Sequence, residues 1–230
     1  MEQQQTLVIG DIHGQLRELE EMIAMVPDGT KIISCGDLVD RGPSSKEVVD
    51  FCIDNNVQVC LGNHEAMVID AARNIPMIWD SHWFDNGGKE VYDTYETEEE
   101  FLRHVEFFKS LPVYINTGHK IGEREVIASH TYILDMVDPD VPDGLASISQ
   151  GMKWPLLWSR TRPASEKRQA WVNIHGHTPT DIYAKLTHVP FFSKSSINLD
   201  TGCCYDSKGR GYLTGILLPS QNIIQIKRKT

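Results

Sequence analysis

The stretch GDIHG, Gly10–Gly14, follows the short apolar segment TLVI at residues 6–9, and its pattern returns twice further along the chain. CGDLVDRGP begins at Cys35 after KIIS, and LGNHEAM begins at Leu61 after VQVC. Each time an expected strand stops at a glycine that is followed by Asp or Asn. Apolar residues at helical spacing come next in all three cases, so the sequence predicts alternating strands and helices with parallel neighbouring strands.

The polar residues in these three stretches are expected to meet at one edge of the sheet. Parallel strands direct their carboxyl ends to the same side, so Asp11, Asp37 and Asn63 can converge although they are far apart in the sequence. Side chains alternate along an extended backbone, which places Asp11 and His13 on the same side. The glycines before them allow sharp turns and keep bulk away from a bound group.

Two later expected strands add histidines to this oxygen-rich set. His130 closes VIASH, with His119 as its alternative, and His177 lies in VNIHGHTP. A mixture of carboxylate, amide and imidazole ligands suits Mn²⁺, Fe or Zn²⁺ better than Ca²⁺ or a thiolate-bound structural metal. Because one carboxylate can bridge, the ligand count fits a centre of two metal ions, a type that catalyses in-line phosphoryl displacement.

The motifs GDIHG, GDLVDRG and GNHE, a later histidine and GHTP resemble, in order and across residues 10–214, the phosphoprotein phosphatase family of calcineurin-like metallophosphoesterases. The small bacterial and phage members are the most similar. The resemblance implies an α/β fold in which mixed β-sheets form a central sandwich flanked by helices. It also implies a phosphoric monoester hydrolase with two divalent metal ions, Mn²⁺ foremost, in which a metal-bridging hydroxide attacks phosphorus directly.

The resemblance assigns a role to each matching residue. His64 would protonate the leaving alkoxide, Asp40 would orient His64, and Arg41 would bind phosphate oxygens in the catalytic step. LLWSRTRP resembles the segment that carries a second phosphate-binding arginine, which points to Arg160 with Arg162 as a close rival. The implied metal ligands are Asp11, His13, Asp37 as the bridge, Asn63, His130 and His177.

Three functions are weighed against one another. A serine/threonine protein phosphatase, acting on phosphoproteins or phosphopeptides, is favoured because the chain has Asp40 and Glu65. The alternative is a symmetrical diadenosine tetraphosphate hydrolase, but that branch tends to lack this aspartate and to have GNHD in place of GNHE. The third function, an inactive phosphate-binding module, is disfavoured because every expected ligand position is filled.

The chain is expected to form one domain over residues 1–230, since no linker or repeat divides it. Residues 78–112 are rich in aromatic and acidic residues and are expected to form a helical cap-like insertion, with an amphipathic helix at Thr97–Leu111. The last third is expected to be rich in strands, in the segments EVIASH, WVNIHGH, INLDTG, GYLTGILL and NIIQIKR.

Charge and composition exclude several classes of partner. The net charge of −10 disfavours binding to nucleic acid or to anionic membranes. No apolar run approaches the roughly 20 residues that a membrane-spanning helix needs, and the first residues lack the basic and apolar regions of a signal peptide. The five cysteines form no C-x-x-C pair, so reduced thiols in a cytoplasmic protein are expected.

Overall fold

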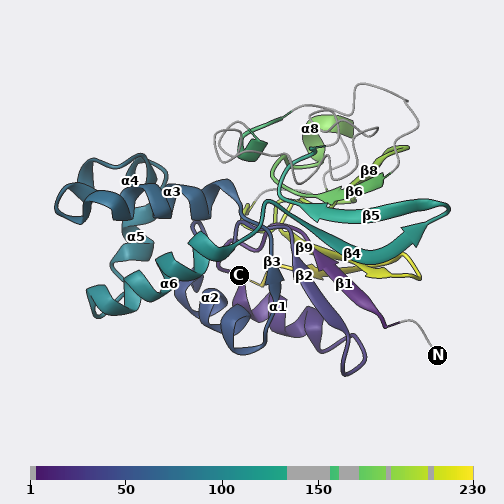
Figure 1. Cartoon of the computed structure of the whole chain (residues 1–230), viewed down its shortest axis with the longest axis horizontal. Coiled ribbons are helices and arrows are strands. Elements are labelled where there is room, and N and C mark those ends of the chain that lie inside the picture. The colour runs from purple at the N-terminus through teal and green to yellow at the C-terminus, as the bar shows by residue number, and fades with distance from the viewer. Residues whose placement is uncertain (1–3, 134–155, 161–170, 185–187, 207–209, 230) are drawn as a thin grey trace.

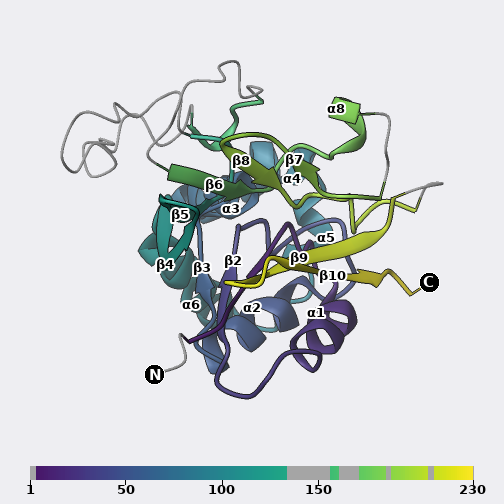
Figure 2. The ribbon, with the colours of Figure 1, turned by 90° about the vertical axis from the view of Figure 1, so that its right-hand side faces the viewer.

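The structure, a computed structural model, describes residues 4–133, 156–160, 171–184, 188–206 and 210–229. Two five-stranded sheets lie one above the other, and helices cover the outer face of one of them (Figures 1 and 2). Each sheet contains both parallel and antiparallel pairs. The expected α/β fold, mixed sheets in a sandwich flanked by helices, is confirmed.

The first sheet is built around the strands that precede the three glycine-containing stretches. Its strand order is β10-β9-β1-β2-β3. As the sequence predicts, β1 pairs in parallel with β2, and β2 with β3, whereas β9 and β10 are antiparallel additions. The strands are β1 Thr6–Ile9, β2 Lys31–Ser34, β3 Gln58–Val59, β9 Tyr212–Leu218 and β10 Asn222–Lys227.

The second sheet has the order β4-β5-β6-β8-β7. Strands β5, β6 and β8 are parallel, and β4 and β7 flank them as antiparallel edges. The two edge strands are absent from the expectations drawn from the sequence. The strands are β4 Tyr114–Ile121, β5 Arg124–Ser129, β6 Trp171–His175, β7 Phe191–Phe192 and β8 Ser196–Asn198.

Helices α1, α2 and α6 lie on the face of the first sheet that points away from the second (Figures 1 and 2). No helix in the described ranges is long and apolar enough to cross a membrane. The helices are α1 Leu16–Ile23, α2 Ser45–Asp54, α3 Asn63–Ala71, the 3₁₀ segment η1 Ala72–Asp80, α4 His82–Asp85, α5 Gly88–Tyr92, α6 Glu98–Ser110 and α8 Asp181–Ala184.

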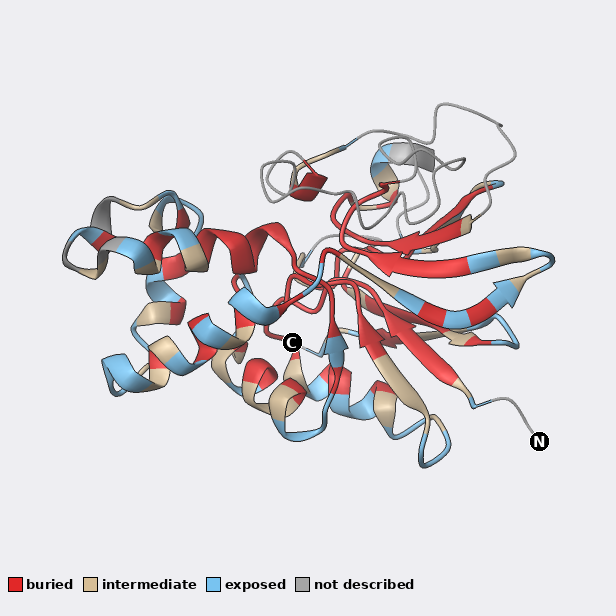
Figure 3. Ribbon diagram, in the orientation of Figure 1, coloured by how far each residue is buried: buried red, intermediate tan, exposed pale blue. Residues whose placement is uncertain are grey.

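Apolar side chains from both sheets form the layer between them. Val8 and Ile33 from the first sheet pack in one cluster with Ala128 and Ile174 from the second, and all four are fully buried. Cys60 lies in the same cluster as a free thiol. The inner strands are therefore buried along most of their length, as the colouring of Figure 3 shows, and burial of this apolar surface holds the two strand edges in register.

The segment from residue 78 to 112, called the helical insertion below, consists of the end of η1 and the helices α4, α5 and α6. The amphipathic helix expected at Thr97–Leu111 is present as α6. The Thr97 side chain caps it by accepting a hydrogen bond from the Glu100 backbone N–H at 3.2 Å. On its inner face Phe101 and Phe108 are fully buried. The function of the insertion as a cap stays a prediction.

Candidate metal centre and active site

Five strand ends bring polar side chains to one place where the two sheets meet. Asp11 follows β1, Asp37 follows β2 and Asn63 follows β3, all from the first sheet. His130 follows β5 and His177 follows β6, both from the second sheet. Strands β1, β2 and β3 are parallel to one another, and so are β5 and β6. All five side chains therefore lie at the carboxyl ends of parallel strands, the position at which α/β sheets bind ligands.

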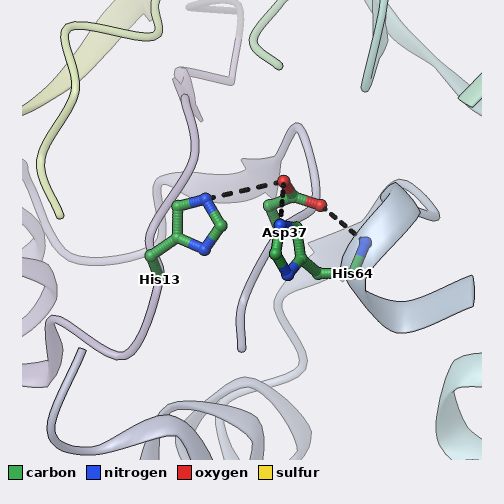
Figure 4. A group of neighbouring side chains, drawn as sticks. All are labelled: His13, Asp37 and His64. Carbon is green, nitrogen blue, oxygen red and sulfur yellow. Dashed lines mark hydrogen bonds and ion pairs between the residues drawn. The ribbon is translucent and has the colours of Figure 1, made fainter. Parts of the chain in front are cut away.

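Asp37, His13 and His64 form the first group of side chains that could hold a metal ion (Figure 4). The Oδ2 atom of Asp37 lies 3.6 Å from Nε2 of His13 and 3.9 Å from Nε2 of His64. The other carboxylate oxygen, Oδ1, accepts a hydrogen bond from the His64 backbone N–H at 3.1 Å. All three side chains are buried.

Asp37 also belongs to a second group, with His130 and His177. Its Oδ1 atom lies 3.4 Å from Nε2 of His130. Asn63 completes the group, because its Oδ1 atom is 2.8 Å from Nε2 of His130 and 2.9 Å from Nδ1 of His177. The structure therefore places Asp37 between both groups, where a bridging ligand has to stand.

The donor atoms of the second group fit a cation. Nδ1 of His130 lies 3.2 Å from the carbonyl oxygen of Cys35, which can only accept, so Nδ1 carries the proton and Nε2 offers a lone pair. Nδ1 of His177, at 3.0 Å, and the Asn63 and Asp37 oxygens surround that Nε2 atom. Electron-pair donors gathered in this way around one point are suited to a divalent metal ion.

Asp11 adds a second buried carboxylate. Its two oxygens accept the backbone N–H of His177 at 3.1 and 3.0 Å. Burial, with the neighbouring carboxylates of Asp200 and Asp37, raises the pKa of Asp11 well above its usual range, a repulsion that a bound cation would relieve. Gly176 permits this approach, because a Cβ atom there would lie 1.9 Å from Oδ1 of Asp11.

The electrostatics of the site favour neutral imidazoles beside an ionised bridge. Burial lowers the pKa of His13 and of His130, and it lowers the pKa of His177 to about 3. Burial alone would raise the pKa of Asp37, but the imidazoles around it, first His130 and then His64, bring it below its usual value. Neutral imidazole and ionised carboxylate are the forms that bind metal.

The backbone at the site is strained. Seven described residues other than glycine have a positive φ, and five of them belong to the candidate site: His13, Asp37, Asp40, Arg41 and His177. A left-handed conformation of such a residue costs on the order of 1–3 kcal/mol and persists only where the surroundings enforce it. Five left-handed residues in one site indicate that the backbone conformation there serves to position these side chains, at a cost in stability.

Glu65 is one of the groups that hold this backbone. Its Oε2 atom accepts the backbone N–H groups of Asp37 at 2.9 Å and Gly62 at 3.0 Å, and its Oε1 atom accepts that of Leu38 at 2.7 Å. The Glu65 side chain is fully buried. It thus fastens the turn after β2 to the turn after β3, and with them Asp37 and Asn63.

His64 and Asp40 form a buried pair beside the metal ligands. Nδ1 of His64 lies 2.5 Å from Oδ2 of Asp40. Burial would lower the pKa of His64, but the charges of Asp37 and Asp40 outweigh it and raise that pKa above its ordinary value, so His64 is suited to hold a proton. Trp83 donates from Nε1 to the same carboxylate. Sequence reasoning missed Trp83, since only the aromatic richness of the insertion marks it.

An open pocket adjoins these groups and contains guanidinium groups. Arg41 and Arg160 both line it, with His64. Nη1 of Arg41 donates to Nε2 of His13 at 3.0 Å. Arg162, the rival of Arg160, lies outside the described residues. The pocket therefore offers two cationic side chains next to the proposed metal ligands, an arrangement suited to a phosphate group.

Two further residues of this pocket were not expected from the sequence. The Tyr205 ring lies near two guanidinium groups, with its centroid 5.7 Å from Cζ of Arg41 and 4.8 Å from Cζ of Arg210. Arg210 is itself paired with Asp181. No local signal in the sequence singled out Tyr205 and Arg210, because neither belongs to one of the motifs, and their contact depends on the tertiary structure.

The structure separates the two candidates for the later histidine. Nε2 of His119 lies 2.9 Å from Oγ1 of Thr6, at the start of β1 and so at the opposite end of the sheet from the site. His130 lies among the metal-ligand candidates. Every other ligand expected from the sequence is also found at this edge, whereas the chemical role of each remains to be tested.

Comparison with known proteins relates the chain to phosphoesterases. The sequence model of the calcineurin-like phosphoesterase family matches residues 5–209. The asymmetrical bis(5'-nucleosyl)-tetraphosphatase PrpE of Geobacillus thermodenitrificans is 25% identical over 95% of this chain and 92% of its own length. Serine/threonine-protein phosphatase 2 of Salmonella typhimurium is 32% identical over 67% of each chain. A protein serine/threonine phosphatase structure from Saccharomyces cerevisiae, at 18% identity, superposes with a TM-score of 0.61 over 99% of this chain and 80% of its own, which shows the shared fold.

Proposed function

The chain belongs to the calcineurin-like phosphoesterase family, and we propose that within this family it removes phosphate from phosphoserine and phosphothreonine in proteins or peptides. The observation that carries this proposal is the buried pair of His64 and Asp40, whose Nδ1 and Oδ2 atoms are 2.5 Å apart and whose His64 side chain lines the arginine-containing pocket. Such a pair supplies a proton to a leaving group, and the need for that proton distinguishes the candidate substrates.

The leaving groups of the candidate substrates differ in basicity. A serine or threonine alkoxide is strongly basic and has to be protonated as the P–O bond breaks, so a general acid is worth about 10²–10⁴-fold in rate. The phosphate released from a phosphoanhydride is a weak base and leaves without such help. His64 is held by the buried Asp40 carboxylate, and its pKa is raised above the ordinary value. These two properties suit a proton donor and therefore support phosphomonoester hydrolysis.

Two groups of metal-ligand candidates lie between the strand ends, and two divalent cations held there would supply Lewis-acid charge and an activated water. We assign their ligands to the residues that converge there. Asp37 would be shared. His64 also lies within the first group, but its Nδ1 is engaged by Asp40. Its Nε2 is 3.9 Å from Oδ2 of Asp37, against 3.6 Å for Nε2 of His13, so we assign His64 to donate a proton from Nε2 rather than to bind metal. The other proposed ligands are Asp11, His13, Asn63, His130 and His177.

The phosphate group itself would be held by the pocket arginines. Arg41 contacts His13 of the first metal-ligand group, and Arg160 lines the pocket near His177. A planar guanidinium group can donate two parallel hydrogen bonds to phosphate oxygens, which fixes the phosphorus in line for attack and neutralises charge in the transition state.

Hydrolysis of a dinucleoside tetraphosphate is the second candidate function. It is favoured by one observation: the relative named as an asymmetrical tetraphosphatase aligns with 95% of this chain, whereas the serine/threonine-protein phosphatase aligns with 67% at higher identity. The two substrate classes place different demands on the same residues, since only the phosphomonoester needs a proton donor of the kind that His64 and Asp40 form.

The deciding experiment compares kcat/KM for a phosphoserine peptide, a phosphotyrosine peptide and diadenosine tetraphosphate, all with Mn²⁺. We expect the phosphoserine peptide to be cleaved with the highest kcat/KM, and the Asp37→Asn variant, purified in parallel, to show the background rate. If diadenosine tetraphosphate is cleaved tenfold or more faster than either peptide, the second candidate replaces the first.

A further inference from the structure

Trp83 in α4 joins the helical insertion to the Asp40–His64 pair. Its indole Nε1–H donates to Oδ1 of Asp40 at 2.9 Å and lies 3.2 Å from Oδ2, the oxygen that faces Nδ1 of His64. Trp83 is 1% exposed and Asp40 is 0% exposed. Because water does not reach this contact, the hydrogen bond has no solvent competitor, and a donor to a charged acceptor is among the stronger kinds.

The indole is held in one orientation by its neighbours. It stacks on the ring of Phe101 in α6, with centroids 5.9 Å apart and planes 12° from parallel, and meets the Tyr92 ring edge-on. Gly88, at the start of α5, lies so close that a Cβ atom there would come within 2.4 Å of the indole. Trp83 therefore cannot turn away from Asp40 unless α5 or α6 also moves.

Asp40 depends on this donor for its orientation. Among the described residues, the hydrogen-bond partners of its carboxylate are His64 on one side and Trp83 on the other. Its backbone is in the left-handed region, with φ of 70°, and is fixed by the hydrogen bond from its N–H to Oγ of Ser45 at 2.9 Å. The side-chain torsion is then set by the indole N–H, which donates to Oδ1 at 2.9 Å and to Oδ2 at 3.2 Å and so holds the carboxylate with Oδ2 facing His64.

We propose that Trp83 is a positioning residue for proton donation: its indole N–H orients Asp40, and Asp40 in turn orients His64 toward the leaving group. The inference rests on the proposed function, in which His64 is the proton donor. It gives the helical insertion a part in the chemical step, because α5 and α6 fix the indole. Loss of the N–H would leave the metal ligands in place and misalign only the donor.

The first test is Trp83→Phe, which keeps an aromatic ring and removes the N–H. We expect kcat on a phosphoserine peptide to fall about 10-fold, which is less than for His64→Asn, while kcat on nitrophenyl phosphate falls less than twofold. KM for both substrates and the metal content should be unchanged. Phe84→Leu, in the same helix and in edge contact with the indole, is the matched control and should lower both rates equally or not at all.

The second test asks whether Trp83 acts through Asp40. In a double-mutant cycle, adding Trp83→Phe to Asp40→Asn should cause no further selective loss on the peptide. A readout independent of activity comes from NMR of protein with ¹⁵N-labelled tryptophan, in which each of the five tryptophans contributes one indole N–H signal. The signal that Trp83→Phe removes should shift in Asp40→Asn and stay in place in Asp28→Asn, an exposed turn position away from the indole.

The outcomes separate this inference from the proposed function. Suppose that His64→Asn lowers turnover of the peptide selectively, whereas Trp83→Phe lowers turnover of both substrates equally or leaves both unchanged. Trp83 then has no positioning role, and the proposed function stands. If His64→Asn itself shows no selective loss, both are overturned. Should the phenylalanine variant fail to fold, incorporation of 3-benzothienylalanine at Trp83, which replaces the N–H by sulfur in a ring of the same shape, gives the same comparison.

Discussion

The Oδ1 atom of Asn63 lies 2.8 Å from Nε2 of His130, although the two residues follow strands of different sheets. Asn63 begins α3 in the turn after β3, and His130 is the residue that follows β5. Their contact exists only because apolar side chains between the sheets, such as Val8 and Ile174, hold the two strand edges together. The candidate metal centre therefore depends on the packing of the two sheets. A substitution at the strand ends of one sheet should also change the positions of the ligand candidates that come from the other sheet.

Replacement of Asp37 tests the shared ligand. Asp37→Asn keeps the shape of the side chain but removes the charge that lies between both groups. We expect loss of at least one metal ion per chain and of nearly all activity, measured by elemental analysis and phosphatase assay. Asp28→Asn, at an exposed turn, is the control and should retain metal and rate. Two bound ions with high turnover in Asp37→Asn would refute the bridging assignment.

Replacement of Glu65 tests the clamp on the strained turns. In Glu65→Gln one backbone N–H that now faces a carboxylate oxygen would face an amide N–H₂ group instead. We expect the free energy of unfolding to fall by about 1–3 kcal/mol, the cost of an unsatisfied buried group, as measured by urea denaturation. Glu47→Gln, on the exposed face of α2, should leave the midpoint unchanged. An unchanged midpoint in Glu65→Gln would remove Glu65 from this role.

Replacement of the two arginines in LLWSRTRP decides between them. Arg160 lines the pocket, so Arg160→Gln should weaken competitive inhibition by inorganic phosphate about tenfold and raise KM for the peptide. Arg162→Gln, two residues away, is the matched control and should change both values less than twofold. The assignment of Arg160 is wrong if the effects of the two variants are reversed.

The sequence predicts the part of this structure that local patterns encode. Asp11, Asp37 and Asn63 each follow a strand and a glycine, and parallel pairing of β1, β2 and β3 brings them to one edge without further information. His130 and His177 also stand at strand ends, but their approach to Asn63 requires the second sheet to pack on the first. The family resemblance supplied that step, which residue patterns alone do not contain.

Contacts that depend on tertiary packing were missed. Trp83 and Asp40 are 43 residues apart, and no periodicity in the aromatic-rich insertion indicates that one indole meets that carboxylate. The edge strand β4 was missed because it is half exposed and polar, and its register is irregular between Asn116 and Lys120, around a left-handed Gly118. Strand β7 has two residues, too few for an alternation pattern to be visible.

Turnover of the His64→Asn variant on two substrates that differ in leaving group, with metal content determined on the same samples, tests directly whether His64 is the proton donor. We expect both ions to stay bound although His64 lies within the first group, because its Nδ1 is engaged by Asp40 and we assign metal binding to the other residues of the two groups. We also predict that turnover of a phosphoserine peptide falls by about 10²-fold or more, while turnover of nitrophenyl phosphate, whose leaving group needs no proton, falls far less. Equal losses on both substrates with the metals retained, or loss of a metal ion on replacement of His64, would contradict its role as the proton donor.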